Sequence, residues 1–76
     1  MTFESLCVLT KLFVDSTNVE QSLCNKLADA KAAAASGKTK TKQNILDAYV
    51  KQVEAQSGKS MTTAQAAKLI ELAKQL

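Results

Sequence analysis

The stretch SGKTKTK at residues 36–42 separates two long segments of helical pattern, and SGKS at residues 57–60 repeats its beginning. Glycine readily adopts the left-handed backbone conformation in which many helices end, so Gly37 and Gly58 are each expected to end a helix. They are the only glycines of the chain, and proline is absent. The two stretches therefore divide the 76 residues into helical segments and predict an all-α fold.

Gly-Lys-Thr and Gly-Lys-Ser also resemble the end of the P-loop that binds nucleotide phosphates. That motif requires an earlier glycine, with four residues between it and the Gly-Lys pair, and a strand leading into the loop. The required positions hold Ala32 and Val53, and both preceding segments have a helical pattern. A nucleotide site is therefore not expected, and no cofactor is predicted.

Four segments carry apolar residues at helical spacing, and they predict four short helices. Asn18 with Gln21, and Thr62 with Gln65, have the pattern of capping boxes, and Thr2 is a further candidate N-cap. Connections of about two to five residues predict antiparallel neighbours in one compact bundle over residues 1–76. The expected helices cover Thr2 to Asp15, Val19 to about Ser36, about Thr41 to Ser57, and the residues after Thr62.

The expected core is thin, because aromatic residues make up only 4% of the chain and much of its apolar content is alanine. Tyr49 lies between Ile45 and Val53 on an apolar stripe, so packing is its expected role. Some apolar residues near the helix ends could instead lie outside the core and form a patch for a partner. These are Leu12, Val14, Leu72 and Leu76.

The two cysteines are placed where a cross-link between helices is feasible. Cys7 lies ~12 Å along the first helix from the connecting turn, and Cys24 lies ~9 Å along the second. In an antiparallel hairpin they would face each other at nearly the same level, so a disulfide is predicted. Such a bond implies export to an oxidising compartment. Two buried free thiols, or a redox or metal role, are the alternatives. No metal site is predicted, since the chain has neither His nor a Cys-x-x-Cys motif.

Catalytic chemistry is not expected from this composition. Histidine, the commonest general base, is absent, and the seven Asp and Glu residues are scattered over polar helix faces. The chain also lacks arginine, the residue best suited to phosphate and base recognition, so nucleic acid is not an expected partner. The sequence therefore predicts a protein that is not an enzyme.

Lysine is concentrated at the second turn of a chain whose net charge is +3. Lys38, Lys40 and Lys42 alternate with threonines there, and Lys59 lies at the next turn. Such a group can attract an anionic polymer. The alternative interpretation is a solvated loop. Aromatic residues, which would indicate stacking on single-stranded nucleic acid, do not accompany these lysines.

Membrane insertion is not expected, because no stretch approaches the roughly 18 consecutive apolar residues of a membrane span. The N-terminal residues are too amphipathic for a signal peptide. If the protein is exported, its signal lies outside this chain. The expected location is secreted or on the cell surface.

Two long segments resemble a known bacterial module. SLCNKLADAKAAAASGK at residues 22–38 resembles its helix followed by a glycine-ended turn. The second segment, NILDAYVKQVEAQSGKSMTTAQAAKLIELAKQL at residues 44–76, resembles its second half. The module is the FIMAH-type domain at the C-terminus of large secreted bacterial proteins. The cysteine pair is not part of its general pattern, so this chain resembles a disulfide-bearing variant of it. The matching positions are Leu23, Lys26, Leu27, Ala30, Gly37, Leu46, Tyr49, Val50, Val53, Gly58, Lys59, Thr62, Ala66, Leu69, Ile70 and Ala73.

The resemblance implies an appended C-terminal module without catalytic activity, excised from a larger exported protein. Such a module would act as a spacer, a stabiliser or a docking domain, with other domains or a cell-surface component as partners. The alternative is a binding module for an anionic cell-surface polymer or glycan, acting through residues 38–42. A small intracellular regulator or nucleic-acid binder is a second alternative, and it would require reduced cysteines.

Overall fold

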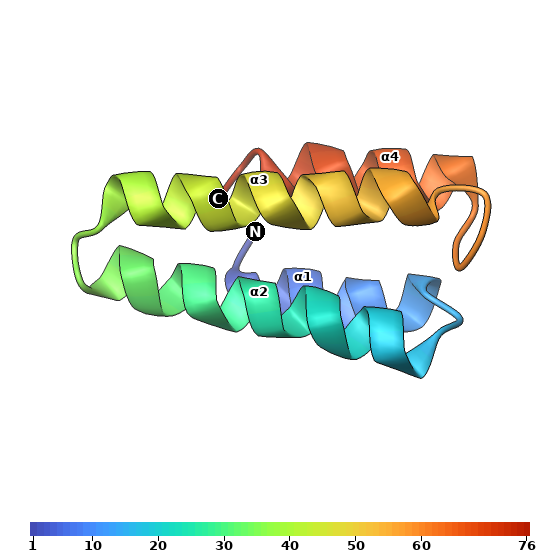
Figure 1. Ribbon diagram of the computed structural model, residues 1–76, viewed down its shortest axis with the longest axis horizontal. Helices are drawn as coiled ribbons and strands as arrows, with labels where there is room; N and C mark the ends of the chain where they lie inside the picture. The colour runs from blue at the N-terminus through green and yellow to red at the C-terminus, as the bar shows by residue number, and fades with distance from the viewer.

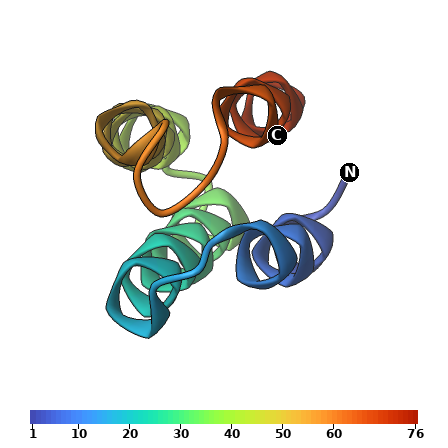
Figure 2. The same cartoon turned by 90° about the vertical axis from the view of Figure 1, so that its right-hand side faces the viewer.

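A computed structural model describes all 76 residues as a bundle of four helices. Each helix runs antiparallel to the next (Figure 1), and Figure 2 shows the four at the corners of a quadrilateral. Every pair of neighbours around this arrangement is in contact, including the first helix with the last. The predicted all-α bundle is therefore confirmed. Its helices are α1 (Phe3–Phe13), α2 (Thr17–Ala35), α3 (Thr39–Gln56) and α4 (Thr63–Ala73).

The core occupies the axis of the bundle and draws on all four helices. It also takes in Val14 and Met61 from the connections, each 4% exposed. Leu72, a candidate for the partner patch, is also buried, whereas Leu12 is 72% exposed. The full core is Leu6, Val14, Leu23, Leu27, Ala30, Leu46, Tyr49, Val53, Met61, Ala66, Leu69, Leu72 and Ala73.

The first helix starts as expected and ends two residues early. The Thr2 side chain accepts a hydrogen bond from the Ser5 amide at 3.0 Å, so the predicted N-cap is confirmed. Val14 leaves the helix in an extended conformation and turns into the core. The amide of Asp15 then donates to the carbonyl of Ser60 at 2.8 Å. The expected extension of the helix to Asp15 was therefore wrong, because burial of Val14 and this bond between two connections end it first.

The prediction of Asn18 as an N-cap was wrong. Ser16 caps α2, and its hydroxyl accepts from the Val19 amide at 3.4 Å. Ser16, Thr17 and Asn18 all have side chains able to cap a helix, so local preference barely separates them. The short connection after the buried Val14 selects the first of the three. The third helix likewise begins two residues before the predicted Thr41.

The two glycines end their helices in different ways, although both have positive φ angles, +73° for Gly37 and +77° for Gly58. At the end of α2, Gly37 and Lys38 donate back to the carbonyls of Ala34 and Ala33, which is a Schellman motif. Gly58 instead occupies the third position of a turn closed by the Lys59 amide and the Gln56 carbonyl at 2.9 Å. At α4, the predicted Thr62–Gln65 capping box is confirmed.

Replacing Gly37 with alanine is expected to lower the free energy of unfolding by about 1 kcal/mol. No atom lies within 4 Å of an added Cβ, so the cost comes from backbone strain at positive φ and not from a clash. Gly37→Asn should cost less, since asparagine tolerates this conformation better. Urea unfolding of the two variants and the unchanged chain tests this, and equal midpoints for all three would contradict it.

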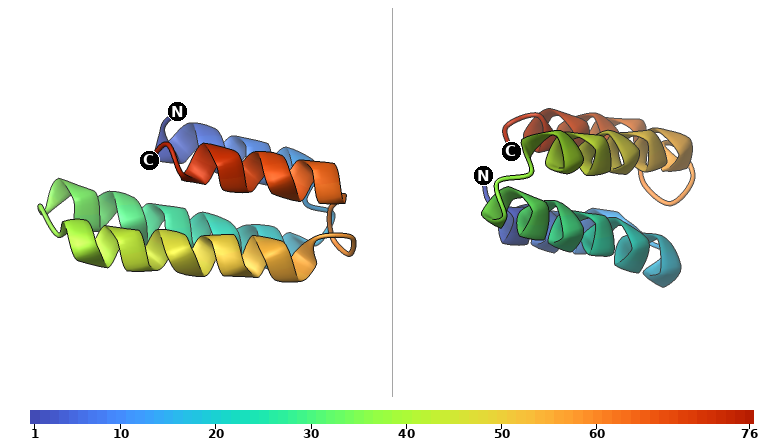
Figure 3. Two further views of the ribbon diagram at one scale, coloured as in Figure 1. Left: turned by 90° about the horizontal axis from the view of Figure 1, so that it is seen from above. Right: turned by 60° about the vertical axis from the view of Figure 1, so that its left-hand side comes forward.

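The α2–α3 hairpin is longer than the other two helices and extends beyond them. The two long helices have 19 and 18 residues, whereas α1 and α4 have 11 each. At one end of the molecule the hairpin therefore projects past both short helices (Figure 3). The start of α1 reaches only the level of Lys31 in α2, because Phe3 and Lys31 line the same recess. The end of the chain after α4 reaches only the level of Lys42 in α3, because Lys42 donates to the main-chain oxygen of Leu76 at 2.6 Å. Residues 32–41 lie beyond these levels and are called the hairpin tip below.

Candidate functional site

Cys7 of α1 and Cys24 of α2 form the cross-link expected from the sequence. Their Cα atoms are 5.1 Å apart, and their sulfur atoms lie at disulfide-bonding distance. The two residues lie at the same level because their separations from the turn between α1 and α2 are similar. The predicted pairing is thus confirmed, and it ties together the two helices that begin the chain.

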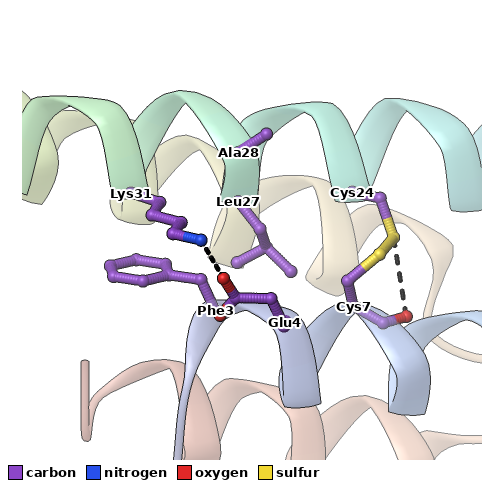
Figure 4. Close-up of a pocket in the computed structure, with 7 residues that line it drawn as sticks. All are labelled: Phe3, Glu4, Cys7, Cys24, Leu27, Ala28 and Lys31. Atoms are coloured by element: carbon purple, nitrogen blue, oxygen red, sulfur yellow. Dashed lines mark hydrogen bonds and ion pairs between the residues drawn. A yellow bond between two sulfur atoms is a disulfide. The ribbon is translucent and has the colours of Figure 1, made fainter.

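An apolar recess lies beside this disulfide, between α1 and α2, with a volume of about 290 Å³ (Figure 4). Glu4 and Lys31 form an ion pair across its mouth, and the hydrogen bond from Lys31 lowers the pKa of Glu4. Glu4 therefore remains ionised at neutral pH, which does not favour a role as a general acid. The remaining lining is apolar and fits packing of a small hydrophobic group. It is made by Phe3, Cys7, Cys24, Leu27 and Ala28.

Thr10 and Tyr49 form a polar pair in the middle of the core, and both are fully buried. The Thr10 hydroxyl lies 2.8 Å from the Leu6 carbonyl, to which it donates, and 2.9 Å from the Tyr49 hydroxyl. Thr10 has only one hydroxyl proton, so Tyr49 is the donor in the second bond. Burial raises the pKa of Tyr49 to about 12. Tyr49 thus packs as predicted and connects α3 to α1.

Raising the pH from about 10 to 12 is expected to destabilise the fold through Tyr49. Below pH 10.0 the phenol is protonated in both states, so its contribution is fully present. Above that pH the unfolded chain releases the proton while the folded chain keeps it until about pH 12. The stability lost is about 2–3 kcal/mol relative to Tyr49→Phe, which has no phenol to titrate.

Urea unfolding of both chains at several pH values measures this difference, and the titrating lysines, which both chains share, largely cancel. Tyr49 is the only tyrosine, so its ultraviolet absorbance reports its ionisation directly. If the absorbance of the folded chain shows Tyr49 ionising at the ordinary tyrosine pKa, the prediction is contradicted.

The structure separates the four lysines that were grouped as a candidate anion site. Lys38 and Lys40 are exposed on the hairpin tip, and Lys42 lies at its base, where it is partly buried. Lys59 lies in the connection between α3 and α4, at the other end of a helix about 27 Å long. It therefore cannot act together with the other three. No side chain caps α3, which begins directly after Lys38.

Lys59 belongs to a second, more polar recess of about 430 Å³ at the opposite end of the bundle. The hydrogen bond between Asp15 and Ser60 holds the two connections together there. Leu12, Phe13 and Asp15 contribute to one side, and residues 58, 59, 61, 62 and 65 to the other. This recess is open, and Leu12 is its most exposed apolar side chain.

Sequence reasoning missed the burial of Thr10 and the ion pair between Glu4 and Lys31. The signal for Thr10 was present, because it lies four residues from both Leu6 and Val14 on one side of the first helix. No group of three His, Cys, Asp or Glu side chains comes together as a metal site. No helix is long and apolar enough to cross a membrane.

Comparison with protein-family models, with curated proteins and with solved structures finds no match to this chain. The resemblance to FIMAH-type modules therefore stays a prediction based on the quoted residues.

Proposed function

We propose that this chain is a non-catalytic module of an exported protein, in which it docks or spaces other domains. The Cys7–Cys24 pair carries the proposal, because its position favours a disulfide and disulfides persist mainly in oxidising compartments outside the cytosol. A small domain with few aromatic residues gains most from such a cross-link.

An exposed apolar side of α1 supports a docking role. Val8 and Leu12 are 57% and 72% exposed and lie four residues apart, which places them on the same side of the helix. Both ends of the chain lie close together in the views of Figures 1 and 3. The two chain ends often lie close together in domains, and such a domain can be joined to other domains while its own packing is kept.

The resemblance to FIMAH-type modules also supports the proposal. Most positions that carry it are buried or belong to turns and caps, and they include Leu27, Tyr49, Leu69, Gly37 and Thr62. These residues serve the fold and not a reaction. The proposal therefore includes a relationship to these modules, with the parent protein providing any catalytic activity.

The test of export is the oxidation state of the cysteines in the protein recovered from its natural source. Acid-quenched material is denatured, treated with an alkylating reagent and weighed by intact mass spectrometry. We expect no alkylation without reductant and two alkylated cysteines after reduction. Two alkylated cysteines in the unreduced sample would contradict an oxidising location.

The absence of catalysis has a separate test. The isolated chain is incubated with common glycan and peptide substrates, and the products are measured by mass spectrometry. We expect no turnover above that of a heat-denatured sample. Turnover that requires the folded chain would overturn the non-catalytic assignment and leave the export test unaffected.

A further inference from the structure

The hairpin tip is the part of the molecule where positive charge collects without acidic neighbours in the chain. Lys38 and Lys40 project from it, and Lys42 lies at its base. The acidic residues closest in sequence are Asp29 and Asp47, so the whole tip carries none. The tip extends past α1 and α4, so the backbones of those two helices do not reach its outer end (Figure 3).

The charges of these lysines are not neutralised by ion pairs. The one ion pair of the molecule joins Glu4 to Lys31, just below the tip. Lys42 donates at 2.6 Å to the main-chain oxygen of Leu76 at the base of the tip, so its ammonium group is already engaged there, whereas Lys38 and Lys40 are exposed. Lys38 and Lys42 are four residues apart and share a side of α3, whereas Lys40 points away from them. The positive charge is thus spread around the tip and does not converge on one point.

The other side chains of the tip are short, which lets a polymer approach the lysines closely. Nine of its ten residues are exposed, and the non-lysine residues are alanine, serine, glycine and threonine. No aromatic side chain is present for stacking on bases, and no large apolar one for entry into a bilayer. Lysine without arginine provides compact point charges and lacks the planar fork that recognises a single phosphate.

We infer that the hairpin tip binds an acidic polysaccharide, a chain of repeated carboxylate-bearing sugars, through Lys38, Lys40 and Lys42. Charges that are spread around the tip can contact several anionic groups along a flexible polymer, whereas they do not converge on a single bound ion. This inference rests on the proposed function, because export is what brings the tip into contact with such polymers. It deepens that function by naming the partner of one surface, and it assigns no role to Lys59.

Binding of the intact, oxidised chain to oligogalacturonate at low ionic strength tests the inference, with the methyl-esterified oligomer as an uncharged control. The tip variant Lys38→Gln/Lys40→Gln is compared with Lys51→Gln/Lys68→Gln, which removes the same charge from exposed lysines elsewhere. We expect the tip variant to lose about tenfold in affinity and roughly two-thirds of the salt dependence, because it removes two of the three lysines. The control variant should lose much less, and the esterified oligomer should not bind.

Amide chemical shifts of the unchanged chain provide a second measurement that needs no substitution. Titration with oligogalacturonate should move signals of residues 36–42 and leave those of the connection around Lys59 in place. Equal losses in the two variants, or shifts spread over the whole surface, would overturn the inference. So would tighter binding to single-stranded nucleic acid or to anionic vesicles. Any of these results leaves the cysteine oxidation test, and with it the proposed function, unaffected.

Discussion

Removing the Cys7–Cys24 bond by replacing both residues with alanine is expected to lower the free energy of unfolding by about 3 kcal/mol. The two residues are 17 apart in the sequence, and closing a loop of that length restricts the unfolded chain by about this amount. In a domain of this size each kcal/mol changes the melting temperature by about 4–8 °C, so we expect a fall of roughly 10–25 °C. This loss is a large share of the total stability, because a core with few bulky residues provides little stability of its own.

Thermal unfolding followed by circular dichroism measures this change. Reductant should lower the melting temperature of the unchanged chain nearly to that of the double variant, and it should leave the variant itself unaffected. A reduced chain as stable as the oxidised one would show that packing between α1 and α2 is sufficient alone. In that case the argument that this small core needs a cross-link would fail.

Replacing Tyr49 with alanine is expected to lower the free energy of unfolding by about 3–5 kcal/mol. Its ring is the largest fully buried side chain of the core, so its loss leaves a cavity between α3 and α1. Small domains have a total stability of about 5–15 kcal/mol, so this single change can leave a large unfolded fraction. Urea unfolding measures the loss, and a variant within 1 kcal/mol of the unchanged chain would contradict the central position of Tyr49.

Smaller changes separate the ring from its hydroxyl. Tyr49→Phe should lower the free energy of unfolding by only about 1 kcal/mol, because the Thr10 hydroxyl keeps its hydrogen bond to the Leu6 carbonyl and is not left without a partner. Thr10→Val should cost more, about 1–3 kcal/mol, because the buried Tyr49 hydroxyl then has no acceptor. The double variant should cost less than the sum of the two, since it leaves no buried donor without a partner. Additive losses would indicate that the hydroxyls do not interact.

Much of the local structure could be predicted because it depends on neighbouring residues. Thr62 and Gln65 form their capping box from side chains three residues apart, and Gly37 ends α2 because its backbone alone favours positive φ. Cys7 and Cys24 could be paired because helix rise converts their distances from one turn into a common level. Candidate function was less accessible, because the lysines were grouped by sequence and not by position in space.

Short-range geometry is enough to predict the number of helices, the glycine-containing turns, one capping box and the cysteine pair from the residues alone. Tertiary packing settles that Thr10, whose spacing from Leu6 is compatible with burial, is buried while Leu12 is exposed, because this depends on which side of α1 faces its neighbours. It also placed Lys59 far from the hairpin tip and left that tip projecting beyond the short helices. These outcomes depend on how helices of unequal length align, and the alignment is set by the sum of contacts between residues distant in sequence.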